Sequence, residues 1–262
     1  MAPVDDAPDD KEPFFERFST ERIIRLVTER EDIHDFRPVL RPPVPVLTVL
    51  DDGSLEHGEE FRLRRDRLAI GRTSGEVQIP NDASISRAHA EIRRIPVEGG
   101  GYRWQLHDLG SVNGTFVRCL RATLHPQTIV ILGGRRYHLK SPLNSSPVLA
   151  GDSTDTSLAD GRNLPERSWP VFVEKTAKQG AAEFLLETDK YLLGRMGGGA
   201  DIEIDDPLLA NKHAILRRQR DGSWMIQAQA TRNGLWVSTT AVELTPHCFF
   251  RCGEQRFRFL IP

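Results

Sequence analysis

The chain repeats one arrangement of short motifs twice along its 262 residues. The pair Gly71-Arg72 in the first half is matched by Gly194-Arg195 in the second. The pair Asn113-Gly114 is matched by Asn233-Gly234, so the two motifs lie 42 residues apart in the first half and 39 in the second. A repeat of this kind predicts two copies of one structural unit rather than two unrelated domains.

The segment between these motifs repeats as well. Residues 84–92 (SISRAHAEI) find their counterpart in residues 208–216 (LLANKHAIL), and both segments contain a His-Ala pair at the same place, at His89 and His213. We therefore expect two domains, residues 46–140 and residues 169–262. A block of roughly 95 residues is long enough to bury a core of its own.

Both blocks show the pattern of β-strands. Short runs of alternating or β-branched apolar residues are separated by turn signals such as Asp-Gly, Gly-Gly and Asn-Gly. Strands at this spacing without long helices between them favour an all-β fold of two antiparallel β-sandwich domains, with a barrel as the alternative. The expected strands are 46–50, 61–70, 89–95, 102–106, 115–119, 128–132 and 136–139, then 171–174, 184–193, 213–217, 224–228, 235–238, 249–250 and 255–261.

The segments outside the two blocks differ from them in composition and charge. Residues 141–168 are rich in Ser, Thr, Pro, Gly, Asn and Asp without a sustained period, which is typical of a flexible linker. Residues 1–45 predict an acidic tail, a short amphipathic helix within residues 14–32 and a proline-rich lead-in, with Ser19 or Thr20 as the helix cap. Counted by sequence, these two segments carry net charges of −2 and −4, whereas the first and second blocks carry +3 and +1.

The overall composition excludes several classes of protein. With 35 basic and 37 acidic side chains and 39% hydrophobic residues, the chain is neither a disordered acidic tail nor a basic nucleic-acid coat. A nucleic-acid partner is not predicted, because the sequence has no basic stripe with stacking aromatic residues. A membrane helix is not predicted either, because no apolar run reaches the roughly 20 residues that it needs. Three cysteines and an acidic start without the pattern of a secretory signal favour a soluble protein of the cytoplasm.

The sequence predicts no catalytic residues, no metal and no cofactor. The glycine-rich stretch 196–199 lacks the Gly-Lys-Ser/Thr sequence of a phosphate-binding loop, and no nucleophile motif is present. Cys248 and Cys252 are either a fragment of a metal site or, in the interpretation we favour, buried thiols. No second Cys/His pair with suitable spacing accompanies them.

The order of the motifs resembles the forkhead-associated (FHA) domain. The first block carries Gly71-Arg72, then residues 86–90 (SRAHA), then residues 108–115 (DLGSVNGT), and the second block carries a reduced version of the same series. The resemblance covers residues 46–140 and 169–262, about 70% of the chain. It implies a sandwich of two twisted sheets whose apical loops bind phosphothreonine peptides.

The residue types of the first block suit such a ligand. A phosphothreonine carries a charge of about −1.5 to −2 and three acceptor oxygens, so it needs a guanidinium group and neutral donors. A bidentate arginine contact is roughly twice as strong as a neutral hydrogen bond. We expect the peptide-binding residues to be Arg72, Ser86, Arg87, Ser111 and Asn113, with Gly71, His89 and Gly114 as structural support.

The second block departs from the motif at the positions that would contact phosphate. Arg195 and Asn233 match Arg72 and Asn113, and Thr231 offers a hydroxyl where the first block has Ser111. Ala210, however, stands at the position of Ser86, and Asn211 stands at the position of Arg87. Hydrogen bonds to charged groups contribute about 1.5–3 kcal/mol each, so losing two of them weakens binding by at least about tenfold. We predict that the fold of this block persists and that phosphate recognition is weak or lost.

These observations predict a non-catalytic signalling adaptor whose first domain binds Thr-phosphorylated proteins. We expect these partners to be substrates of a Ser/Thr kinase or regulators that act near it. A phosphate-independent structural or oligomerisation adaptor is the alternative. Four threonines beside acidic residues are candidates for phosphorylation, after which the first block could bind them within or between molecules. The tether would raise the effective concentration of such a threonine to about the millimolar range. The alternative is that they are ordinary residues of polar segments. They are Thr20, Thr28, Thr154 and Thr156.

Overall fold

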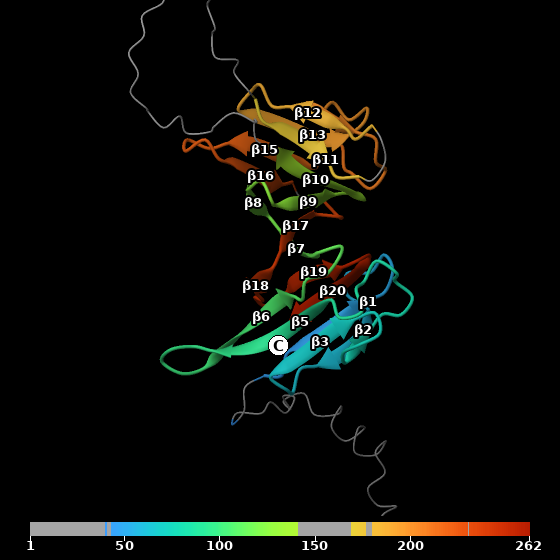
Figure 1. Ribbon diagram of the computed structural model, residues 1–262, viewed down its shortest axis with the longest axis vertical. Coiled ribbons are helices and arrows are strands. Elements are labelled where there is room, and N and C mark those ends of the chain that lie inside the picture. Colours follow the sequence, from blue (N-terminus) through green and yellow to red (C-terminus); the bar gives the residue numbers. More distant parts are fainter. Residues whose placement is uncertain (1–39, 41–42, 141–168, 177–179, 230) are drawn as a thin grey trace, which may run out of the picture. The chain divides into compact units, whose positions relative to one another are not determined.

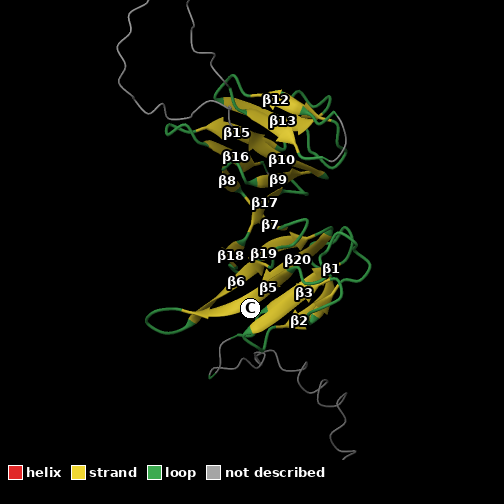
Figure 2. Ribbon diagram, viewed as in Figure 1, coloured by secondary structure: helices red, strands yellow, loops and turns green. Residues whose placement is uncertain are grey.

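The computed structural model describes residues 40, 43–140, 169–176, 180–229 and 231–262, and the described residues from Val44 onward belong to one compact unit. Every regular element in this part of the chain is a β-strand (Figures 1 and 2). The predicted all-β class is therefore confirmed. The predicted helix within residues 14–32, the predicted linker 141–168 and the four candidate threonines lie outside the described residues.

In the part of the chain that the structure describes, each of the two sequence blocks contributes ten strands. Those of the first half are β1 (Val46–Leu50), β2 (Gly58–Arg62), β3 (Arg67–Gly71), β4 (Val77–Gln78), β5 (Ala90–Pro96), β6 (Tyr102–Asp108), β7 (Thr115–Cys119), β8 (Arg121–Leu124), β9 (Ile129–Leu132) and β10 (Arg135–Lys140). Those of the second half are β11 (Val171–Glu174), β12 (Glu183–Leu185), β13 (Lys190–Arg195), β14 (Ile202–Ile204), β15 (Ala214–Arg218), β16 (Trp224–Ala228), β17 (Leu235–Thr239), β18 (Ala241–Glu243), β19 (Cys248–Cys252) and β20 (Gln255–Leu260).

Alternation of apolar and polar residues explains most of these strands, because successive side chains point to opposite faces of a sheet. In β20, Phe257 and Phe259 are fully buried, and Arg256 and Arg258 alternate with them. The two longest predicted runs are each divided in the structure. Residues 61–70 contribute to β2 and β3, which are separated by the exposed Arg64-Arg65-Asp66 segment, and residues 184–193 divide in the same way between β12 and β13.

The strands form two sandwiches. One is made by the sheet β18-β6-β5-β3-β4 and the β7-β19-β20-β1-β2 part of a ten-stranded sheet. The other is made by the sheet β14-β13-β15-β16-β8 and the β12-β11-β10-β9-β17 part of the same ten-stranded sheet. Most neighbours are antiparallel, and the short pairs β3–β4 and β13–β14 are parallel. The predicted antiparallel sandwich architecture is thus confirmed.

Each sandwich contains strands from both sequence blocks. The last hairpin of the second block, β19–β20, pairs with β1 and β7 of the first block. The last hairpin of the first block, β9–β10, pairs with β11 and β17 of the second. In Figure 1 the red strands β19 and β20 accordingly lie beside the blue strand β1. The boundaries 46–140 and 169–262 therefore describe repeats in the sequence, while the folded sandwiches exchange their last strands.

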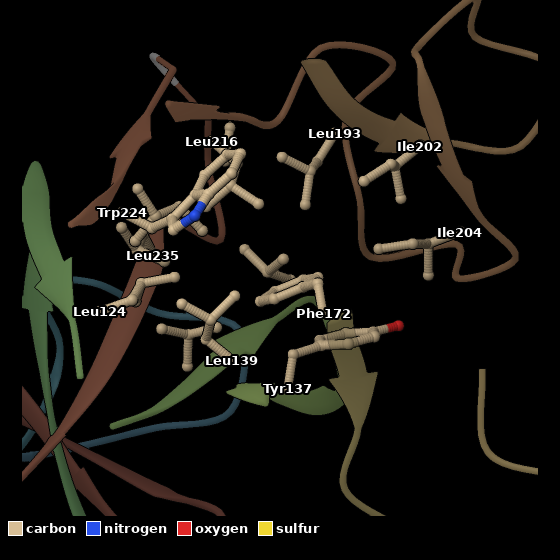
Figure 3. Close-up of a cluster of buried hydrophobic side chains, with 14 of the residues drawn as sticks. Leu124, Tyr137, Leu139, Phe172, Leu193, Ile202, Ile204, Leu216, Trp224 and Leu235 are labelled. Carbon is tan, nitrogen blue, oxygen red and sulfur yellow. The ribbon is translucent and has the colours of Figure 1, made fainter. Parts of the chain in front are cut away.

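The buried cores show the same exchange. In the second sandwich, Leu124, Tyr137 and Leu139 of the first block pack among Phe172, Trp224 and other buried residues of the second (Figure 3). The rings of Tyr137 and Phe172 stack with their centroids 5.1 Å apart. In the first sandwich, Phe250, Phe257 and Phe259 fill the corresponding place. Because fully burying one such side chain contributes about 1.5–3 kcal/mol, neither sandwich has a complete core without the other block.

Candidate functional site

Three loops of the first block meet at one end of its sandwich. They connect β3 to β4, β4 to β5 and β6 to β7, and they carry the predicted residues Arg72, Ser86 and Asn113. The backbone N–H of Arg72 donates to the carbonyl of Ser86 at 2.9 Å, so the first two loops lie against each other. Asn113 Nδ2 donates to the carbonyl of Ser84 at 2.8 Å and attaches the third loop.

His89 holds the loop that carries Ser86. Its side chain is fully buried, its Nδ1 accepts the backbone N–H of Ser86 at 3.0 Å, and its Nε2 lies 3.2 Å from the carbonyl of Gly114. An accepting Nδ1 and a donating Nε2 define one neutral tautomer. Burial lowers the pKa of His89 and outweighs the carbonyl and the nearby carboxylates, which act to raise it. His89 thus links the loop that carries Ser86 to the loop that carries Gly114.

The hydroxyl of Ser86 accepts the backbone N–H of Val112 at 3.0 Å, which leaves its own proton available for an acceptor from outside. Gly71 lies where the backbone carbonyl of Arg87 comes so close that any Cβ would collide with it. Gly114 has φ of 79°, a conformation that favours glycine. Both glycines therefore have backbone reasons to be present.

Asp108 organises the third loop, although it was not among the predicted site residues. Its Oδ1 accepts the N–H groups of Gly110 at 2.9 Å and Ser111 at 2.8 Å. Its Oδ2 accepts the hydroxyls of Ser111 and Thr115, both at 2.6 Å. Partial burial acts to raise the pKa of Asp108, but these hydrogen bonds outweigh it, so the pKa is lowered. Its position at the start of the DLGSVNGT segment was the available signal.

These contacts give the predicted residues of the third loop different environments. The hydroxyl of Ser111 donates to Asp108 and accepts the backbone N–H of Gly114 at 3.0 Å. It is therefore occupied in shaping the turn. The amide group of Asn113 is half-buried and keeps its carbonyl oxygen free of hydrogen bonds to the described residues.

Two guanidinium groups lie at this end of the sandwich without a carboxylate partner in the described part of the chain. Arg72 is half-buried, and its Nη1 donates to the carbonyl of Ala83 at 3.3 Å. Arg87 is exposed, and only its backbone carbonyl is engaged, by Ser74. The nearby Asp82 and Asp108 are occupied by hydrogen bonds within the loops. This end of the sandwich is therefore suited to bind an anion.

The second block builds the same framework around different side chains. His213 is buried, its Nδ1 accepts the N–H of Ala210 at 3.3 Å, and its Nε2 lies 3.0 Å from the carbonyl of Gly234. Burial again lowers the pKa of the histidine. Arg195 donates through Nη2 to Asn211 Oδ1 at 3.2 Å. Asn211, which stands at the position of Arg87, therefore engages the counterpart of Arg72.

The remaining residues of this second site keep structural contacts. Asn233 Nδ2 donates to the carbonyl of Leu208 at 2.8 Å, as Asn113 does to Ser84. Thr231 Oγ1 accepts the N–H of Gly234 at 3.2 Å. Leu208 and Met196 are 49% and 58% exposed beside the second site, as Leu109 and Val112 are 37% and 89% exposed beside the first. The second site therefore has the framework of the first, but Ala210 and Asn211 stand where the first has the Ser86 hydroxyl and the Arg87 guanidinium.

The described residues provide no group of three or more His, Cys, Asp or Glu side chains that could hold a metal ion. All three cysteines are free thiols: Cys252 is fully buried, and Cys119 and Cys248 are half-buried. No helix long and apolar enough to cross a membrane occurs in the part of the chain that the structure describes.

Comparison with known proteins gives matches to both blocks. The FHA domain matches residues 68–133 and 191–253. No curated protein matches the chain. Among solved structures, Mycobacterium tuberculosis EmbR in complex with low affinity phosphopeptide is 13% identical over 84% of this chain, with a TM-score of 0.30, and the chain covers 24% of that protein.

Two further solved structures match over shorter stretches. One, from a structural and functional analysis of phosphothreonine-dependent FHA domain interactions, is 37% identical over 28% of this chain and 68% of its own, with a TM-score of 0.22. The other, the FHA domain of the CT664 protein from Chlamydia trachomatis, is 29% identical over 29% of this chain and 70% of its own, with a TM-score of 0.23. The two repeats, the sandwiches and the two family matches agree, and the chain is a tandem member of the FHA-domain family.

Proposed function

We propose that this protein is a non-catalytic adaptor whose first FHA site binds phosphothreonine-containing segments of other proteins. FHA domains are interaction modules that recognise phosphothreonine, and this family property supports the proposal. The observation that carries it is the convergence of Arg72, Ser86 and Arg87 on two loops, with both guanidinium groups free of carboxylates among the described residues. A phosphate with a charge near −2 would satisfy these donors.

Within this proposal the contacts divide among the predicted residues. Arg72 and Ser86 contact the phosphate, Arg87 adds a second positive charge, and Asn113 contacts the peptide backbone through its free carbonyl oxygen. Ser111 acts chiefly through the turn that it forms with Asp108. The partners are Thr-phosphorylated proteins, which are substrates of a Ser/Thr kinase.

For the second site we propose phosphate-independent binding or a scaffold role. Arg195 is held by Asn211, and Ala210 supplies no hydroxyl, so neither the Ser86 hydroxyl nor the Arg87 guanidinium has a counterpart at the same position. This division of roles makes the second site a matched control for the first.

The proposal is tested on the full chain, because each sandwich contains strands of both blocks. A phosphothreonine peptide array identifies a ligand, and calorimetry then compares wild type with Arg72→Ala, Ser86→Ala and Arg195→Ala. We expect each of the first two substitutions to weaken binding by about tenfold or more, since hydrogen bonds to a charged group contribute about 1.5–3 kcal/mol. Arg195→Ala should stay within about twofold of wild type, well under the 1.4 kcal/mol of a tenfold change.

Unphosphorylated versions of the same peptides are the second control. Binding that is equal with and without phosphate, or no binding by any peptide on the array, would contradict the proposal. Either result would favour the alternative, a phosphate-independent structural or oligomerisation adaptor.

A further inference from the structure

The turn between β19 and β20 touches the loop that carries Ser86. Asp82 of that loop accepts the backbone N–H groups of Glu254 at 2.7 Å and Gln255 at 3.2 Å through Oδ2. Its Oδ1 accepts the N–H and the hydroxyl of Ser84, at 2.8 and 2.5 Å. One carboxylate therefore joins a hairpin of the second block to the candidate phosphate-binding loop of the first.

Partial burial acts to raise the pKa of Asp82, but its hydrogen bonds to Ser84, Glu254 and Gln255 outweigh this, so the pKa is lowered. The carboxylate is therefore ionised at neutral pH, when it is the better acceptor for four donors. A second contact also attaches this hairpin to the first block, because Gln255 Nε2 donates to the carbonyl of Leu50 in β1 at 2.7 Å.

The second site shows the same join with the blocks reversed. Asp206 is buried, and its Oδ2 accepts the N–H of Gly134, in the β9–β10 turn of the first block, at 2.8 Å. Its Oδ1 accepts the N–H of Leu208 at 2.8 Å. The guanidinium of Arg135 donates to the carbonyl of Asp205 at 2.8 Å. The loop of the second site is thus attached to the last hairpin of the first block.

From these two reciprocal contacts we infer that the last hairpin of each block positions the binding loop of the other block. The turn at Gly253-Glu254 is then a positioning element of the first site, although every residue proposed to contact the ligand lies at or before residue 113. The inference about the loop stands on geometry alone, and only its binding readout rests on the proposed function.

Two glycines allow this inference to be tested with matched variants. Gly253 has φ of 59°, and a Cβ there would meet Asp82 Oδ2 at 2.7 Å, Ile85 Cγ1 at 2.8 Å and the hydroxyl of Ser84. Gly133 has φ of 62°, and a Cβ there would meet Asp206 Oδ2 at 2.6 Å. Alanine is strained by a positive φ at both positions alike. The variants Gly253→Ala and Gly133→Ala therefore differ mainly in which loop they disturb.

The experiment uses the full chain and two readouts, amide hydrogen exchange and calorimetry with a phosphothreonine peptide. We expect Gly253→Ala to speed exchange in residues 79–89 and to weaken peptide binding by about tenfold or more. We expect Gly133→Ala to speed exchange in residues 203–213 and to leave peptide binding within about twofold of wild type, well under the 1.4 kcal/mol of a tenfold change. A general loss of stability would instead speed exchange in both segments.

The opposite pattern, in which Gly133→Ala disturbs residues 79–89 and Gly253→Ala disturbs residues 203–213, would overturn the inference, because each hairpin would then serve its own block. An equal response of both segments to either variant would overturn it too. If wild type binds no phosphothreonine peptide, the proposed function fails, and the hydrogen-exchange pattern still decides the positioning role.

A second measurement applies if a glycine variant does not fold. A protease site placed within residues 141–168 allows the folded full chain to be cut between the blocks. Because each core contains residues of both blocks, the two fragments should stay together on native gel filtration and separate only in denaturant. Fragments that separate after cleavage in native buffer would overturn the inference.

Discussion

Replacing His89 with alanine tests whether the buried histidine supports the binding loop. The imidazole joins the N–H of Ser86, in one loop, to the carbonyl of Gly114, in another. In His89→Ala both backbone groups lose their partner inside a fully buried space. A buried polar group without a partner costs about 1–3 kcal/mol, so the two together reduce the free energy of unfolding by about 2–6 kcal/mol.

Peptide affinity should fall as well, because the contact of the Ser86 backbone N–H with His89 Nδ1 helps to hold the loop that carries Ser86. A loss of 1.4 kcal/mol in preorganisation is a tenfold loss in affinity, so we expect a decrease of about tenfold or more. Urea unfolding followed by fluorescence of the tryptophans measures the stability, and calorimetry with a phosphothreonine peptide measures the affinity of the variant that remains folded.

The matched control is His213→Ala, which removes the equivalent contacts with Ala210 and Gly234 in the second block. It should lower stability by a similar amount and leave peptide affinity within about twofold of wild type, well under the 1.4 kcal/mol of a tenfold change. If His89→Ala kept wild-type affinity, or if both variants lost affinity equally, the histidine would have no specific part in holding the binding loop.

Three further predictions concern the pH dependence, the third loop and the thiols. Burial lowers the pKa of His89 and His213, so below pH 6.5 the unfolded chain binds protons that the folded chain does not. The free energy of unfolding should therefore be constant above pH 6.5 and fall below it, by up to about 1.4 kcal/mol per pH unit for each histidine. Urea titrations from pH 7.5 to 5 measure this decrease. Asp108→Ala should reduce stability by about 2 kcal/mol or more and weaken phosphopeptide binding, because four donors in the third loop lose their acceptor; unchanged melting and affinity would contradict this. Burial raises the pKa of Cys119 and of Cys248 to about 11, so at pH 8 both should react with a thiol reagent far more slowly in the folded protein than in urea.

Much of this fold follows from the sequence because its information is local. The bounds of β1, β7, β11 and β16 agree with the predicted runs to the residue, since each run is short, apolar and ended by turn residues. The strands that were missed, such as β8 (Arg121–Leu124) and β18 (Ala241–Glu243), are short and mixed in character. They are strands because a neighbour in the other block pairs with them, and a propensity pattern does not contain that neighbour.

The candidate site was predictable in its residue types and less so in its hydrogen bonds. Arg72, Ser86 and Asn113 come together as the motif implied, because the loops that carry them are short and end at defined strands. The roles of Asp82 and Asp108 depend on which donors a carboxylate meets after folding. A sequence pattern shows that a carboxylate is present, but it does not show the partner when that partner lies 172 residues away.

The exchange of hairpins was invisible in the sequence for a physical reason. The two blocks are copies of one unit, and β9–β10 and β19–β20 hold equivalent places in the two sandwiches. Both last hairpins also present a glycine turn to an aspartate, Asp206 in one case and Asp82 in the other. The local contacts of an exchanged pair and of two separate domains would therefore be alike.

What distinguishes the exchanged arrangement is the crossing itself. There β7 and β17 pair antiparallel from Leu235↔Cys119 to Thr239↔Thr115, with Val237 opposite Val117 at the centre. This ladder joins strands of the two repeats at the same point of each copy. Beside it, Phe116, Ile131 and Trp236 form a small buried cluster between the two main cores. These residues lie where the two repeats meet, and they stabilise the crossing. Polar substitutions at Phe116 and Trp236, which belong to this cluster, should therefore favour separate domains, and the cleaved chain would then come apart in native buffer.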